Sequence, residues 1–144
     1  LIWDISRLLE TLHEINYNID AVVSEVFEEK IKKTNNLRGI SRLLETLYRI
    51  KYNLGWVYEI EPHFFEERIK KSVDIQDISR LLEILYTINY DLKWIKDLEP
   101  DDFMKQDLFP TTGHIKTLLN ILKKHGYPEE RLKRIEEYYG VERS

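Results

Sequence analysis

The sequence predicts an all-α protein built from helical repeats. A thirteen-residue block, ISRLLETLHEINY, begins at Ile5 and returns with ten of its thirteen residues at Ile40 and at Ile78. Within each block, apolar residues recur at alternating steps of three and four, which is the spacing of one face of an α-helix. A period of 35 to 38 residues is typical of helical repeats that bury one another's faces. We therefore expect a helical repeat bundle or solenoid with three clear repeats and one degenerate repeat.

The length and composition fit a single domain. With 144 residues, of which 42% are apolar, the chain can bury a core without disulfides. Its net charge of −4 gives no general attraction to nucleic acid or to anionic membranes. The absence of cysteine excludes thiolate metal sites and cysteine nucleophiles. The high charge content resembles that of thermophile proteins, and since no apolar run would span a membrane, we expect a soluble, cytoplasmic protein.

Each of the first three repeats is expected to contain one long helix. In the first repeat, apolar residues keep the helical spacing from Leu1 to Val26, which predicts a helix over about residues 1–33. The alternative is a helical hairpin in every repeat, because the degenerate copy reads Gly126-Tyr127-Pro128, a stop and restart, at the matching place. In that case the N-caps after the break would be Asn18, Asn53 and Asp91.

Short connecting helices and a C-terminal helical hairpin complete the predicted fold. The segment FEEKIKK at Phe27 returns as FEERIKK at Phe65. Proline suits the first turn of a helix, and Asp and Thr are favoured N-caps. On these grounds we expect helices to begin at Pro62, after Asp74, at Pro100 and at Thr111-Thr112. The repeats then span residues 1–36, 37–74, 75–111 and, in degenerate form, 112–144.

The motif Ser-Arg-x-x-Glu occurs in all three clear repeats, on the side of the helix opposite the apolar stripe. Arg and Glu three residues apart can pair within one helix or with an adjacent helix. As a catalytic motif it lacks a base beside its serine nucleophile. We interpret it as a structural brace, with partner binding as the alternative. The brace residues are Arg7, Glu10, Arg42, Glu45, Arg80 and Glu83.

Repeats two and three carry a second apolar face in which aromatic residues step by four. Helices with two apolar faces are expected in the middle of a stack, and a helix with one, as in the first repeat, at its edge. The aromatic ladder is therefore expected to be core. The alternative is an exposed groove for a partner. The resulting partner-binding candidates are Tyr48, Tyr52, Trp56, Tyr86, Tyr90 and Trp94.

The sequence shows no catalytic, cofactor-binding or metal-binding constellation. We therefore expect a non-enzymatic scaffold that binds another protein or itself, without cofactors. The alternative is a nucleic-acid-binding accessory domain that uses the basic and aromatic C-terminal hairpin. Its candidate residues are Lys123, Lys124, Arg131, Lys133 and Arg134.

Arg7 and His13 are spaced as Arg-x5-His, which resembles the Arg-x4-6-His signature of the all-helical HEPN ribonucleases. The resemblance covers this one short motif. It implies RNA cleavage, or descent from an RNA-cleaving protein, as a further alternative function. Repeats two and three have Tyr48 and Tyr86 at the histidine position, so His13 also reads as one member of the aromatic ladder.

Overall fold

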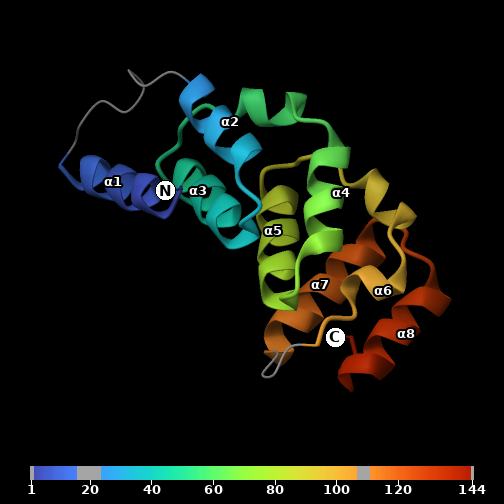
Figure 1. Cartoon of the computed structure of the whole chain (residues 1–144). Helices are drawn as coiled ribbons and strands as arrows, with labels where there is room; N and C mark the ends of the chain where they lie inside the picture. Colours follow the sequence, from blue (N-terminus) through green and yellow to red (C-terminus); the bar gives the residue numbers. More distant parts are fainter. Residues whose placement is uncertain (1, 16–23, 107–110, 144) are drawn as a thin grey trace. The chain divides into compact units, whose positions relative to one another are not determined.

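The computed structural model describes residues 2–15, 24–106 and 111–143. Within these ranges the chain forms α-helices joined by short 3-10 helices, and no strand, which confirms the all-α prediction (Figure 1). The elements are α1 (Ile2–Glu14), α2 (Ser24–Lys33), α3 (Leu37–Arg49), η2 (Gly55–Glu59), α4 (Pro62–Lys71), α5 (Ile75–Thr87), η3 (Lys93–Asp97), α6 (Pro100–Phe103), α7 (Thr112–Lys124) and α8 (Glu129–Tyr139). They form two compact units, Leu1–Glu61 and Pro62–Ser144.

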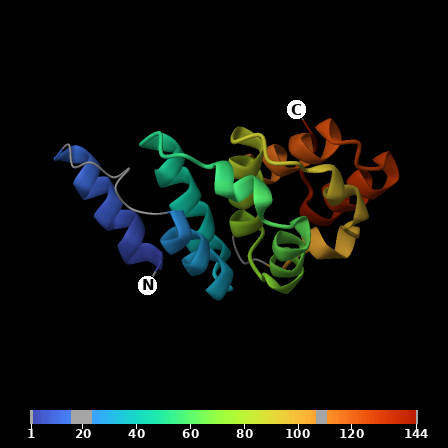
Figure 2. The ribbon, with the colours of Figure 1, turned by 90° about the horizontal axis from the view of Figure 1, so that it is seen from above.

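In the first unit, α1 and α3 run side by side, and α2 lies against α3 in both views (Figures 1 and 2). Ile2 meets Gly39 near the start of both helices, and Glu10 meets Arg49 near their ends, so the two helices are parallel. The edge of the Phe27 ring on α2 packs against Tyr52, with ring centroids 5.2 Å apart. α2 thus covers the end of α3.

The expectation of long helices is wrong for repeats two and three. α3 ends at Arg49 and α5 ends at Thr87, although the apolar spacing continues beyond both residues. Lys51 and Asn89 adopt left-handed backbone conformations, with φ of 61° and 62°, which an α-helix cannot continue through. In the first repeat, α1 ends at Glu14, and the predicted passage through residues 16–23, with Asn18, lies outside the described residues.

A hydrogen-bonded C-cap ends both helices. The N–H of Tyr52 donates to the carbonyl of Leu47 at 2.9 Å, and the N–H of Lys51 donates to that of Tyr48 at 3.1 Å. These two bonds define a Schellman motif, which satisfies carbonyls that a helix end leaves open. The same pair of bonds follows α5, around Asn89, and α7, around Gly126. The sequence predicted the helix end at Gly126, because glycine readily adopts positive φ. It did not predict the ends before Lys51 and Asn89, because these residue types are less typical of such a cap.

The chain then restarts, as the hairpin alternative predicted, but as a 3-10 helix whose N-cap is Leu54 or Leu92 and not the predicted Asn53 or Asp91. The side chains of Asn53 and Asp91 accept hydrogen bonds from the backbone N–H two residues on, at 2.8 and 2.9 Å. Other predicted starts are confirmed. α4 and α6 begin at Pro62 and Pro100, Asp74 caps α5 through Gln76 N–H at 2.8 Å, and Thr111 precedes α7.

In the second unit, α5 packs against α7, and α7 packs against α8 as the predicted C-terminal hairpin. Aromatic pairs recur here at the same repeat positions as Phe27 and Tyr52 in the first unit. Phe65 meets Tyr90 edge-on at 5.2 Å, and Phe103 meets Tyr127 at 5.9 Å. Each phenylalanine belongs to one repeat and each tyrosine to the next. The connecting segment of a repeat therefore packs on the helix end of the repeat that follows it.

Candidate interaction surface

One face of α1 is buried against α3. Ile2, Ser6 and Leu9 lie on this face and are all buried. α3 has Gly39 in its first turn, where a Cβ atom would overlap Cγ2 of Ile2. Glycine is therefore what allows the two helices to approach this closely.

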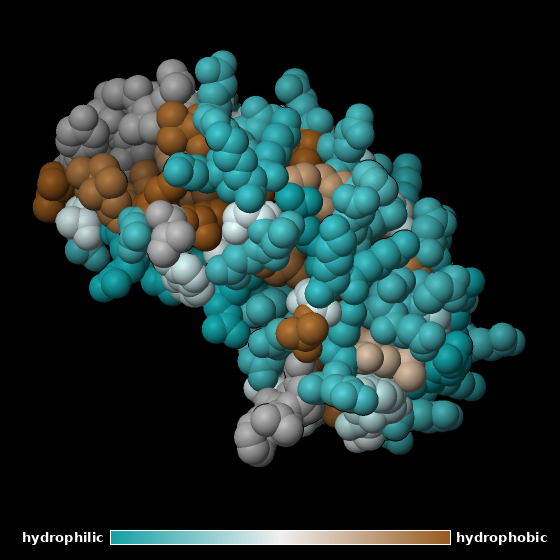
Figure 3. Space-filling model, in the orientation of Figure 1, coloured by the Kyte–Doolittle hydropathy of each residue, from teal (hydrophilic) through white to brown (hydrophobic). Residues whose placement is uncertain are grey.

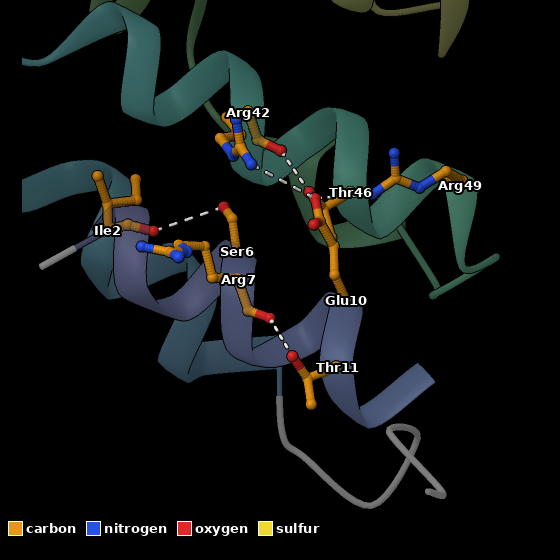
Figure 4. A network of polar contacts seen from close by, with 8 residues as sticks. All are labelled: Ile2, Ser6, Arg7, Glu10, Thr11, Arg42, Thr46 and Arg49. Atoms are coloured by element: carbon orange, nitrogen blue, oxygen red, sulfur yellow. Dashed lines mark hydrogen bonds and ion pairs between the residues drawn. The ribbon is translucent and has the colours of Figure 1, made fainter. Parts of the chain in front are cut away.

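Polar residues close the side of the same interface (Figure 4). Glu10 Oε1 lies 2.8 Å from Arg49 Nη2 and 3.8 Å from Arg42 Nη2, both on α3. The guanidinium of Arg42 also lies over the ring of Trp3, 5.0 Å from its centroid. Arg7 is exposed and points away from Glu10. The repeated Glu and Arg of the first two repeats therefore meet between helices.

The matching interface in the second unit uses different contacts. Ser79 on α5 is buried and donates a 2.7 Å hydrogen bond to the carbonyl of His114 at the start of α7. Lys124 of α7 lies over the ring of Tyr86, with its Nζ 5.0 Å from the centroid. Glu83 is exposed, while Glu45 and Arg80 are partly buried. For these three residues the brace role stays a prediction.

The second face of α1 carries an apolar stripe, which we define as Ile5, Leu8, Leu12 and Ile15. Leu8 is 58% exposed and Ile15 is 66% exposed, and the other two are partly exposed. Hydrophobic side chains gather over α1 in the space-filling view (Figure 3). An edge helix with one apolar face is expected to bury that face, but α1 buries the side that carries Ser6 and leaves Leu8 and Ile15 exposed.

The corresponding residues elsewhere are identical in type but covered. In the second repeat they are Ile40, Leu43, Leu47 and Ile50, and in the third they are Ile78, Leu81, Leu85 and Ile88. The first three of each set are 0% exposed, Ile88 is 3% exposed and Ile50 is partly exposed. Their shared chemistry shows that exposure of the α1 stripe comes from its surroundings and not from its sequence.

Within each repeat the three aromatic ladder residues differ in exposure, because the helix that would align them ends early. Tyr48 and Tyr86 are 50% and 39% exposed. Tyr52 and Trp56 are partly buried, whereas Tyr90 and Trp94 are buried. The indole N–H groups of Trp56 and Trp94 donate to the carbonyls of Asn53 and Asp91, within their own turns. The buried pair matches the core interpretation, while Tyr48 and Tyr86 remain accessible.

Three of the five nucleic-acid candidates, Lys124, Arg131 and Arg134, are engaged with the protein itself. Arg131 donates to the carbonyl of Lys96 at 3.1 Å and lies 3.9 Å from Glu99. Arg134 lies 3.4 Å from Asp101. Lys123 and Lys133 line an open hollow together with Arg143, but Glu136, Glu137 and Glu142 line it as well. Lys124 lies on the Tyr86 ring. This mixture of charges leaves no concentrated positive surface, and nucleic-acid binding stays a prediction.

Arg7 and His13 are both exposed on α1. Six residues of α-helix turn the chain by about 600°, so the two side chains project roughly 120° apart. That separation does not direct them to one reacting phosphate. The described residues add no further feature that resembles the HEPN ribonucleases.

None of the helices in the described ranges combines the length and the apolar character needed to cross a bilayer. Across the same residues, no three His, Asp or Glu side chains are grouped as ligands for a metal ion. Comparison of the chain with protein families, with curated proteins and with solved structures gave no match in any of the three.

Proposed function

We propose that this protein is a non-enzymatic helical-repeat scaffold that binds another protein through the α1 stripe. The observation that carries the proposal is the exposure of Leu8 and Ile15, at 58% and 66%, where the second and third repeats have buried or largely buried residues of the same type. Burying one such side chain contributes about 1.5–3 kcal/mol. A contiguous apolar patch of this kind on a helix is typical of a protein-binding surface.

The repeat arrangement belongs to the same proposal. Successive repeats are linked by the pairs Phe27 with Tyr52, Phe65 with Tyr90, and Phe103 with Tyr127. In a repeat protein each unit buries its faces against its neighbours. The α1 stripe is apolar and exposed, whereas α8 buries Leu132 and Ile135 and most of its remaining surface is charged.

A photo-cross-linking residue at position 8, compared with one at position 11, tests the proposal. Thr11 is also exposed on α1 but lies outside the stripe. We expect protein adducts from position 8 in cells and few from position 11, with the adducts at position 8 reduced when Ile15 is changed to Glu. Equal labelling from both positions, or none from position 8, would show that the stripe is not a binding surface.

A further inference from the structure

The chain contains two helices that accompany a stripe of this composition. α2 carries Phe27 and Ile31 on one face, and α4 carries Phe65 and Ile69 at the matching positions. These four side chains are 0–2% exposed. Phe27 packs on Tyr52, which follows the stripe of α3, and Phe65 packs on Tyr90, which follows the stripe of α5. A Phe-x3-Ile helix therefore contacts the tyrosine two residues beyond the end of each of these two stripes.

The covering helices share a second property, their charged outer surface. α2 reads SEVFEEKIKK and α4 reads PHFFEERIKK, with Glu and Lys or Arg at most positions beside the Phe and Ile. Such a helix is amphipathic and would present its charges to water while its apolar face is buried. Ten residues of helix extend about 15 Å, which is also the span from Ile5 to Ile15. The two lengths match.

α2 does not cover the α1 stripe. Its Phe27 and Ile31 are already buried, with Phe27 on Tyr52, and Leu8 and Ile15 remain largely exposed with α2 in place. The α1 stripe has the same side chains, Ile-Leu-Leu-Ile. Within residues 2–15, 24–106 and 111–143, no Phe-x3-Ile helix accompanies it as α2 and α4 accompany the other two.

We propose that the α1 stripe binds an amphipathic helix of a partner protein, one that carries Phe and Ile four residues apart on its apolar face. This inference rests on the proposed scaffold function and specifies the partner's chemistry. The partner helix takes the place on α1 that α2 takes on α3 and α4 takes on α5. Its Phe and Ile bury against Leu8 and Leu12, and its charged residues remain in solvent.

A peptide copied from α4 is the direct probe. Residues 62–73, labelled with a fluorophore and closed by a lactam between Glu67 and Lys71, would be held helical, because an isolated helix this short is marginal in water. Both bridged side chains point away from the apolar face, since they are exposed in the protein. The matched control peptide has the same lactam with Phe65→Ala and Ile69→Ala.

We expect the parent peptide to bind the full chain saturably in fluorescence anisotropy, and the control peptide to bind at least about tenfold more weakly. Leu8→Glu in the protein should weaken binding by a similar factor, while Thr11→Glu, which adds the same charge outside the stripe, should leave it unchanged. Circular dichroism of both variants checks that they remain folded. Equal binding of the two peptides, or equal binding to the two variants, overturns the inference.

Light scattering separates this inference from the scaffold proposal. If the protein is a dimer that Leu8→Glu dissociates, and the peptide does not bind, the stripe is covered by a second copy and the Phe-x3-Ile inference is wrong while an interaction role stands. If the peptide does not bind and position 8 gives no adduct in cells, both are wrong. Peptide binding that depends on Leu8 supports both.

Discussion

Lys51 and Asn89 are the residues at which the backbone leaves the helical conformation after α3 and α5. Both have positive φ, a conformation that costs an ordinary L-residue about 1–2 kcal/mol and asparagine less. The matching residue of the degenerate repeat is Gly126, with φ of 79°. The Schellman cap therefore has its preferred residue, glycine, after α7, and a less suited residue after α3 and after α5.

Replacing Lys51 by glycine is expected to stabilise the protein by about 0.5–1 kcal/mol, because the strain of positive φ is removed. Asn89→Gly should gain less, since asparagine tolerates this conformation better. Gly126→Ala should lose about 1 kcal/mol although the added Cβ would only touch Lys96, at 3.8 Å. Urea unfolding of the three variants gives the order, and a destabilised Lys51→Gly would contradict the assignment of the cap.

The buried hydroxyl group of Tyr127 makes the stability of the protein depend on pH. Its hydroxyl donates to the carbonyl of Leu98 at 2.8 Å, and burial raises the pKa of Tyr127 to about 12. Because the pKa is higher in the folded state than in the unfolded chain, the neutral hydroxyl favours folding. That stability is complete below about pH 10 and is lost as the pH rises toward 12, by about 2–3 kcal/mol.

We therefore expect the wild-type protein to lose more unfolding free energy between pH 9 and 11.5 than Tyr127→Phe does. The variant should be less stable near neutral pH by about 1 kcal/mol, through loss of the hydrogen bond. Tyr138→Phe is the control, because Tyr138 is 42% exposed. Parallel pH profiles for the wild type and Tyr127→Phe would contradict the role of this hydroxyl.

At the scale of elements, the pairs α1 with α3 and α5 with α7 show two ways to pack the same repeated helix. α3 meets Ile2 of α1 at Gly39, while α7 has His114 at the matching position and accepts a hydrogen bond from Ser79 there. Gly113, one residue earlier in α7, has no atom within 4 Å of where its Cβ would be. Close packing therefore requires the first-turn glycine of α3 but not that of α7.

Gly39→Ala is expected to destabilise the protein by about 1–3 kcal/mol, because the methyl group would force α1 away from α3. Gly113→Ala should instead stabilise it by up to about 1 kcal/mol, through higher helix propensity. Ile2→Ala combined with Gly39→Ala should recover part of the loss. Thermal unfolding of the four proteins measures this, and an equal effect of the two single substitutions would contradict the close approach.

For the molecule as a whole, the surroundings of a residue outweigh its type. Leu8 and Leu81 occupy the same place in repeats one and three, yet Leu8 is 58% exposed and Leu81 is 0% exposed. Leu81→Ala should cost about 2–5 kcal/mol, as other buried Leu-to-Ala changes do. Leu8→Ala should cost less than about 1 kcal/mol. Chemical denaturation of both variants checks the difference, and a large loss for Leu8→Ala would show that the α1 stripe is covered in solution.

Local sequence patterns were enough to predict the helical character and most helix starts. Spacing of three and four identifies an amphipathic helix, and Asp74, Pro62 and Pro100 act through local hydrogen bonds and backbone geometry that need no distant contact. The helix end at Gly126 could be predicted because it too depends on local backbone geometry. These features depend on residues within a few positions of one another.

The ends of α3 and α5, and the exposure of the α1 stripe, depend on contacts between segments that are distant in the sequence. The apolar spacing continues past Arg49 and Thr87, but Tyr52 and Tyr90 pack on phenylalanines 25 residues earlier in the chain, and local periodicity carries no information about such contacts. The α1 stripe has the same side chains as its counterparts in α3 and α5. Periodicity reports which face of a helix is apolar, and only the packing of other elements reports whether that face is covered.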